Sequence, residues 1–209
     1  MYESFENLSD EKRNKIIEAS LEEFSKKGYE RASTNVIVKN AGISKGLLFH
    51  YFKSKKNLFI YLFDRIVKEF VDAFYEFIDD SPSDIFERLM NWTIVKFKLY
   101  YKKPLEYRFL TVSIYDSPEE LKEDILKRYE VISSEVMKRF MENLDLSSFR
   151  KDVDIDRALS FIMISIEAIG NKYIKMYNHD IDRLVADKDK IIDDIKNCIN
   201  ILKYGIYKK

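Results

Sequence analysis

Residues 34–55 read TNVIVKNAGISKGLLFHYFKSK, and this stretch decides the expected fold of the N-terminal part of the chain. Its pattern predicts two short helices that are joined by a turn at Gly42, which tolerates the left-handed conformation that ends a helix. Ser44 offers a hydroxyl cap for the second helix. Two short helices with a glycine in a tight turn are typical of a helix-turn-helix. The sequence therefore predicts a helix-turn-helix from Thr34 to Phe52.

The predicted motif separates packing residues from contact residues. Five apolar or small residues face inward where the two helices cross: Ile37, Ala41, Ile43, Leu48 and Tyr51. Five others on the second helix stay free to meet DNA: Lys45, Gly46, Leu47, Phe49 and His50. A helix of this length fits a major groove about 12 Å wide, with its N-terminal residues toward the base edges.

Individual contacts follow from side-chain chemistry. Lys45 can donate to guanine O6 or N7, whereas Leu47 can only contact a thymine methyl group or exclude water. Thr34 begins the first helix and Lys55 begins the helix after the motif, where backbone N–H groups also point outward. We expect both to bind phosphates, which hold the register without reading sequence.

The distribution of charge favours the same function. The chain has 36 basic and 36 acidic residues, and a net charge of zero would ordinarily argue against nucleic acid. Residues 31–63 nevertheless hold no acidic residue and six basic ones: Arg31, Lys39, Lys45, Lys53, Lys55 and Lys56. Alone, such lysines are usually a solvated face, but their place beside the motif favours DNA contact.

The stretch resembles the TetR family of bacterial transcriptional repressors. That family shows a Thr, a short helix, Ala-Gly-Val-Ser-Lys-Gly, an aromatic-rich helix and a Lys at the start of the next helix. This chain has Thr34 and then AGISKGLLFHYFKSK at 41–55. The resemblance covers roughly residues 10–63 and implies six DNA-contact positions: Thr34, Lys45, Gly46, Phe49, His50 and Lys55.

Three residues depart from the family pattern. Phe49 replaces the usual Tyr and removes a phosphate hydrogen bond of about 0.5–1.5 kcal/mol. Leu47 stands where a small or polar residue is common, which suggests a T-rich half-site. Val38 replaces a frequent Ala, so we expect the two helices to cross at a slightly greater distance. None of these changes removes the motif.

The whole chain is expected to be all-α. Only five Gly and three Pro occur, and apolar residues recur at helical rather than alternating spacing. About nine helices are expected, near residues 10–27, 35–40, 45–51, 55–79, 84–101, 105–115, 118–143, 154–177 and 188–207. We expect a three-helix DNA-binding domain at 1–54 and a C-terminal helical effector-binding and dimerisation domain at 55–209. Without a membrane-length apolar run or a signal-peptide pattern, a cytoplasmic location is expected.

The last two helices are candidates for a homodimer interface. The first of them has one apolar side formed by Ile155, Leu159, Ile162, Ile166, Ile169 and Tyr173, and another formed by Ala158, Phe161, Ile164, Ser165 and Ala168. One side can serve the chain's own core. The other can join Ile191, Ile195, Cys198, Ile199 and Leu202 of the last helix in a four-helix interface. The alternative is that both helices are central core. A dimer would place two recognition helices roughly 34–36 Å apart and predicts a palindromic, double-stranded operator.

Bulky residues between these regions are candidates for an effector pocket: Trp92, Lys96, Tyr100, Arg108, Phe109, Met137, Met163 and Tyr173. Their chemistry is compatible with an apolar pocket that has a few polar anchors, and equally with a packed core. The family resemblance implies that a small apolar or amphipathic effector tilts the long helix starting at Lys55 and releases the repressor from DNA.

Two other functions are weighed. One is a dimeric DNA-binding protein without an effector, whose C-terminal domain serves only dimerisation or partner docking. The other is an enzyme, but no paired carboxylates, activated nucleophile or metal cluster stands out, so we expect no catalytic residue and no cofactor. His50 and His179 are too few and too isolated to hold a metal ion.

Overall fold

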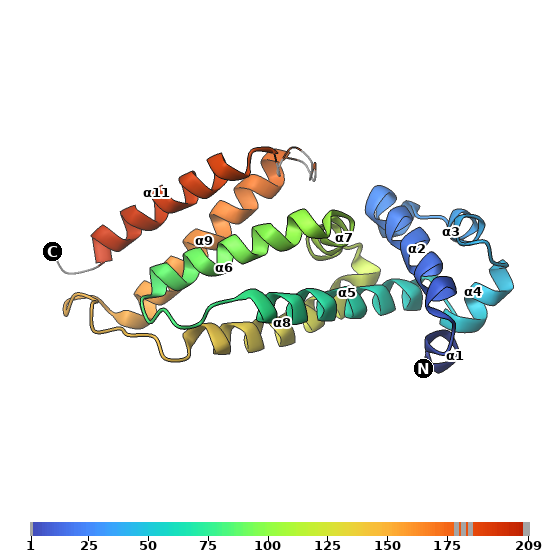
Figure 1. Ribbon diagram of the computed structural model, residues 1–209, viewed down its shortest axis with the longest axis horizontal. Helices are drawn as coiled ribbons and strands as arrows, with labels where there is room; N and C mark the ends of the chain where they lie inside the picture. The colour runs from blue at the N-terminus through green and yellow to red at the C-terminus, as the bar shows by residue number, and fades with distance from the viewer. Residues whose placement is uncertain (1, 178–179, 181–182, 184–185, 207–209) are drawn as a thin grey trace. The chain divides into compact units, whose positions relative to one another are not determined.

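The computed structural model describes residues 2–177, 180, 183 and 186–206 of the chain. This described part contains ten α-helices and no β-strand, which confirms the all-α prediction (Figure 1). The helices are α1 (Glu3–Glu6), α2 (Asp10–Arg31), α3 (Thr34–Ala41), α4 (Lys45–Phe52), α5 (Lys55–Phe77), α6 (Ile85–Lys102), α7 (Pro104–Tyr115), α8 (Glu119–Met141), α9 (Ile155–Tyr177) and α11 (Lys188–Ile206).

Serine caps begin the two helices that follow the turn. The hydroxyl oxygen of Ser44 accepts a hydrogen bond from the backbone N–H of Leu47 at 3.2 Å, at the start of α4. The hydroxyl oxygen of Ser54 accepts one from the backbone N–H of Asn57 at 3.0 Å, at the start of α5. Each bond satisfies a backbone donor that has no partner within its helix, so these starts are set locally.

Two features of the N-terminal part differ from the expectation. Gly28 has a φ of 70° but does not end the helix there, because α2 kinks at this residue and continues to Arg31. Helix α1 was not expected. Its Phe5 is fully buried, with its ring centroid 5.5 Å from that of Tyr51 and 4.7 Å from that of Phe52. Helix α1 therefore covers the C-terminal end of α4.

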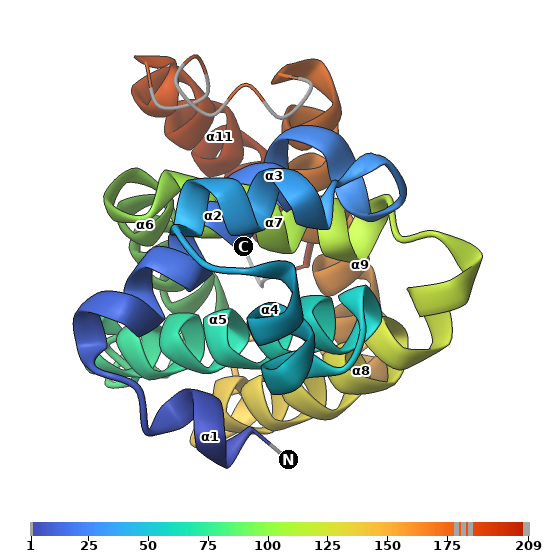
Figure 2. The same ribbon diagram turned by 90° about the vertical axis from the view of Figure 1, so that its right-hand side faces the viewer.

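The chain packs as two compact units, formed by residues 1–72 with 103–134 and by residues 73–102 with 135–209. Helices α5 and α8 contribute residues to both. The ring of Phe59 is buried in the core of the first unit, 5.0 Å from that of Phe24 and 5.1 Å from that of Phe109. Figure 2 faces the side of this unit that carries α3 and α4. The functional division at residue 54 stays a prediction.

In the second unit, α11 packs against both α6 and α9 (Figure 1). Ile191, Ile195 and Ile199 are buried in this packing, so their expected place at a dimer interface is wrong. Helical spacing puts these three on the side of α11 that meets its own chain. The outward side instead carries Ile201 and Tyr204, which are 73% and 80% exposed.

A buried cation in the second unit joins the segment before α6 to the C-terminal end of α8. The guanidinium of Arg88 donates to the backbone oxygens of Asp80 and Pro82, at 2.8 and 3.0 Å, in the segment before α6. It also donates to the backbone oxygens of Phe140 and Glu142, at 2.7 and 2.5 Å, at the C-terminal end of α8. A cation is favoured there because helix dipoles leave negative potential at that end.

Candidate nucleic-acid interface

The turn between α3 and α4 is closed by backbone hydrogen bonds. Gly42 adopts the left-handed conformation with a φ of 68°, and its N–H donates to the oxygen of Lys39 at 3.3 Å. The N–H of Ile43 reaches back to the oxygen of Val38 at 3.0 Å. This pair of bonds satisfies carbonyls at the end of α3, as in a Schellman-type helix end. A residue with a side chain at Gly42 would be strained, because its φ is positive.

The inward-facing residues lie as the sequence predicts. Ile37 and Leu48 are 0% and 1% exposed, and Ala41 and Tyr51 are also buried. Ile43 is half-buried and packs against the same core. Because α4 is held from its inner side by this core, its outer side is presented on a fixed support.

The expected contact residues lie mostly on the outer surface. The exposed ones are Lys45, Gly46, Leu47 and His50, whereas Thr34 and Phe49 are half-buried. Leu47 is 37% exposed, and Val36, on α3, is 40% exposed. The outer side of α4 therefore combines a cation with an apolar residue.

Lys55 has a partner that the sequence did not reveal. Its ammonium group donates to the backbone oxygens of Tyr29, Glu30 and Ala32 at 2.9, 3.2 and 3.3 Å. It also lies 4.5 Å from the centroid of the Tyr29 ring. All three ammonium hydrogens thus have acceptors at the end of α2, where a cation also complements the helix dipole. A phosphate contact by Lys55 stays a prediction, and it requires one of these bonds to be given up.

We expect Lys55→Met to lower the free energy of unfolding by about 1–3 kcal/mol, because it leaves partly buried carbonyls without their charged donor. Urea denaturation followed by circular dichroism measures this change. Lys53→Met is the matched control, since Lys53 is exposed, and it should change stability by less than about 0.5 kcal/mol. Equal stabilities for the two variants would contradict the structural role of Lys55.

A second set of contacts ties the end of α2 and the start of α5 to the start of α8. The hydroxyl of Tyr29 donates to Glu120 Oε1 at 3.1 Å, and burial, followed by this bond, raises the pKa of Tyr29 to about 12. Lys56 Nζ donates to the backbone oxygen of Glu120 at 3.2 Å and pairs with Asp124 at 2.8 Å. The bond with Lys56 lowers the pKa of the Asp124 carboxyl. Two helices far apart in the sequence are thus joined beside the motif.

Residues 31–63, the segment without acidic residues, therefore do not form a single basic patch. Its exposed basic residues are Arg31, Lys39, Lys45 and Lys53. Lys55 and Lys56 instead donate to groups of the protein itself. The lysines of this segment thus differ in their surroundings: Lys39, Lys45 and Lys53 are exposed, whereas Lys55 closes the end of α2 and Lys56 joins α5 to α8.

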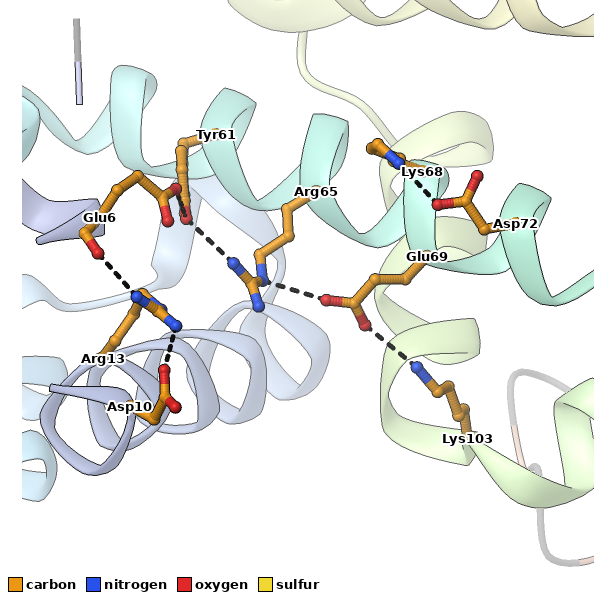
Figure 3. A network of polar contacts seen from close by, with 9 residues as sticks. All are labelled: Glu6, Asp10, Arg13, Tyr61, Arg65, Lys68, Glu69, Asp72 and Lys103. Atoms are coloured by element: carbon orange, nitrogen blue, oxygen red, sulfur yellow. Dashed lines mark hydrogen bonds and ion pairs between the residues drawn. The ribbon is translucent and has the colours of Figure 1, made fainter. Parts of the chain in front are cut away.

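Polar contacts also fasten α1 and α2 to α5 (Figure 3). Arg13 pairs with Asp10 and donates from Nη1 to the backbone oxygen of Glu6 at 2.7 Å. The hydroxyl of Tyr61 donates to Glu6 Oε1 at 2.5 Å, and Arg65 Nη1 donates to that hydroxyl at 3.4 Å. The short α1 is thereby held by its side chains as well as by Phe5.

The same chain of contacts continues to α7. Glu69 pairs with Arg65 at 3.1 Å and with Lys103, the residue before α7, at 3.0 Å. Burial, followed by the bond to Glu6, raises the pKa of Tyr61 to about 12. Since that pKa lies far above neutrality, Tyr61 keeps its proton and serves as a donor within this network (Figure 3).

Two of the candidate pocket residues lie in packed aromatic cores. Phe109 belongs to the core of the first unit and is 1% exposed. The ring of Trp92 lies 5.0 Å from that of Phe74 and 4.9 Å from that of Phe140, and its Nε1 donates to the Asp80 carboxylate at 3.2 Å.

The other six candidates vary in exposure. Tyr173 is buried and its hydroxyl donates to the carboxylate of Asp194. Lys96 and Met137 are exposed, whereas Tyr100, Arg108 and Met163 are half-buried. A cavity between α6 and α11 is lined by other residues, so none of the eight lines it. A pocket formed by the eight stays a prediction.

The described residues contain no group of three or more His, Cys, Asp or Glu side chains placed to hold a metal ion. Of the two histidines, His50 is exposed on α4, and His179 lies outside the residues that the structure describes. Within the described part, no helix is both long and apolar enough to cross a membrane.

Family models match both parts of the chain. Residues 16–62 match the model of bacterial regulatory proteins of the tetR family. Residues 83–207 match the model of a tetracyclin repressor-like C-terminal domain. The first match contains α3 and α4, and the second contains every helix from α6 onward.

Individual proteins agree with these models. An HTH-type transcriptional regulator of Staphylococcus aureus is 26% identical over 183 residues, which cover 83% of this chain and 96% of the relative. The crystal structure of a TetR family regulator from Chloroflexus aurantiacus aligns with a TM-score of 0.71 at 24% identity, over 99% of this chain and 98% of that one. FadR from Bacillus subtilis, solved in complex with stearoyl-CoA, aligns with a TM-score of 0.58 at 19% identity, over 87% and 96%. The chain belongs to the TetR family of bacterial transcriptional regulators.

Proposed function

We propose that this chain is a dimeric repressor that reads a palindromic operator through α3 and α4 and leaves it when a small molecule binds. The observation that carries the proposal is the presentation of α4. Lys45 and Leu47 are exposed on its first turn, while Leu48 and Phe52 are each 1% exposed on its inner side. A short helix fixed from behind, with its first residues outward, suits insertion into a major groove.

The proposed contacts divide by type. Lys45 would donate to a guanine, and Leu47 would contact a thymine methyl group. Four other residues would lie along the DNA backbone, where contacts set the register of the protein on the duplex: Thr34, Phe49, His50 and Lys55. A Cβ added at Gly46 would meet only Ser44 Oγ, at 4.0 Å, so the fold itself does not require glycine there. This supports close approach of DNA to the backbone at Gly46.

Dimerisation is supported by apolar side chains that the chain leaves uncovered on α9 and α11. Phe161 and Ile164 are 58% and 65% exposed on α9, and Ile201 and Tyr204 are still more exposed on α11. We name these four residues the α9–α11 face. Exposed apolar patches of this kind mark protein contacts, and a second copy of the chain would cover the face symmetrically.

An effector is supported by one relative and by chemistry. FadR from Bacillus subtilis is solved with stearoyl-CoA, an amphipathic ligand, and this chain shares its fold. The rival function, a DNA-binding dimer without an effector, is favoured by the packed positions of Trp92 and Phe109, which are core rather than cavity. Repression rather than activation is favoured by the repressor-like model of the C-terminal part.

An operator can be identified by selecting bound sequences from random double-stranded DNA. We expect Lys45→Ala to weaken binding to that operator by roughly 5- to 150-fold, because a good base contact contributes about 1–3 kcal/mol of discrimination. Fluorescence anisotropy with the operator and with scrambled DNA at fixed salt measures the change. Lys138→Ala is the matched control, since Lys138 is an exposed lysine on α8. The proposed reading mode fails if Lys45→Ala binds the operator as tightly as the control does.

A further inference from the structure

We propose that the cavity between α6 and α11 binds a small anion with an apolar chain, of the class of medium-chain carboxylates. The cavity has a volume of about 260 Å³. Its apolar lining comes from Ile94 and Phe97 of α6 and from Ile192 of α11. An alkyl chain placed against these three side chains would leave water for apolar surface, which is favourable.

The remaining lining residues give the cavity an excess of positive charge. Lys98, Lys102 and Lys188 line it together with one carboxylate, that of Asp189. Lys98 is exposed and makes no ion pair within the described part of the chain. The ammonium of Lys102 lies 4.7 Å from the centroid of the Phe77 ring, a contact that leaves its charge available to an anion. Apolar lining with cations at its margin matches a ligand that is apolar with one acidic end.

The volume narrows the class of ligand. Pockets that enclose drug-sized ligands span roughly 300–1,000 Å³, so this cavity suits a smaller molecule. A complete acyl-CoA would exceed it. A medium-chain fatty acid combines the required apolar length with a single carboxylate, and we therefore take decanoate as the probe.

The position of the cavity suggests how such a ligand would act. It lies at the N-terminal end of α11. Near the other end of α11, Lys203 pairs at 3.2 Å with Asp84, the residue before α6. A ligand that wedges between α6 and α11 would pivot α11 about this paired end and so reorient the side that carries Ile201 and Tyr204 of the α9–α11 face. This last step rests on the proposed function, since it assumes that the face pairs two subunits.

Calorimetric titration of the full chain with decanoate, below its micelle concentration, tests the site. The double variant Lys98→Met with Lys102→Met removes two charges and keeps the apolar stems. Lys196→Met is the matched control, because Lys196 is an exposed lysine of α11 that pairs with Asp193 and does not line the cavity. We expect the double variant to lose at least tenfold in decanoate affinity and the control to lose none. The wild type should bind decanol more weakly than decanoate. Without ligand, both variants should have the melting temperature of the wild type.

Several results would overturn the proposal: no binding of decanoate, equal affinity in the double variant and the wild type, or equal affinity for decanol. Operator binding, measured in parallel, separates this inference from the proposed function. Decanoate that binds through Lys98 and Lys102 but leaves operator affinity unchanged supports the site and contradicts its role in release. Decanoate that releases operator from the double variant as readily as from the wild type supports an effector response and contradicts the site.

Discussion

Arg88→Met should lower the free energy of unfolding by roughly 3–5 kcal/mol. The side chain is 1% exposed, and its four bonds go to backbone oxygens of the 80–82 segment and of the end of α8. Hydrogen bonds from charged donors contribute about 1.5–3 kcal/mol each, and partial access of water to some acceptors reduces their sum. Met has a similar stem, so the change removes the donors with little loss of packing.

Chemical denaturation of the full chain measures this effect. Arg157→Met is the matched control, because the side chain of Arg157 is 89% exposed on α9 and should contribute less than about 0.5 kcal/mol. Arg88→Lys keeps the charge but lacks the planar group that reaches four oxygens, so an intermediate loss is expected. A loss below about 1 kcal/mol for Arg88→Met would show that water replaces these bonds without difficulty.

Ile164→Asp should convert a dimer into a monomer and weaken operator binding by roughly 10²- to 10⁴-fold. A charge placed within the α9–α11 face would have to be buried in the dimer without a partner. Losing the second DNA-binding head removes the gain that two linked contacts provide, which is commonly of that size. Ile164 is 65% exposed in the single chain, so its replacement should leave the fold of the subunit intact.

Analytical ultracentrifugation gives the oligomeric state, and anisotropy gives the affinity. Val131→Asp is the control, since Val131 is 58% exposed on α8, outside the α9–α11 face, and it should remain dimeric. If Ile164→Asp stayed dimeric with normal affinity, the pairing surface would have to lie elsewhere on the chain.

The helix-turn-helix could be predicted from the sequence because its signals are local. Gly42 ends α3 by its own conformational freedom, and Ser44 caps α4 through a residue three positions away. The inner residues of the motif repeat with the period of a helix, so Ile37 and Leu48 were identifiable as core. Each of these inferences needs only a few neighbouring residues.

The parts that escaped prediction depend on distant contacts. From the sequence alone, Lys55 is expected to be a surface cation. Its acceptors lie at the end of α2, more than 20 residues earlier, and only the fold brings them together. In the sequence, Arg88 is indistinguishable from an exposed charge on an amphipathic helix. In the structure it donates to a backbone oxygen at the end of α8, 52 residues away. The side of α11 that meets its own chain was misassigned for Ile191, because apolar periodicity marks a buried face without saying which chain buries it.

The central claim is that two copies of this chain read DNA sequence through α4. Selection of bound sequences from a random double-stranded pool by the full-length protein tests it most directly. The account predicts an enriched palindrome whose half-sites lie about 10 base pairs apart, centre to centre, or a multiple of that spacing, with a guanine and thymines where Lys45 and Leu47 reach. Recovery of no preferred sequence, or of one without two-fold symmetry, would contradict it.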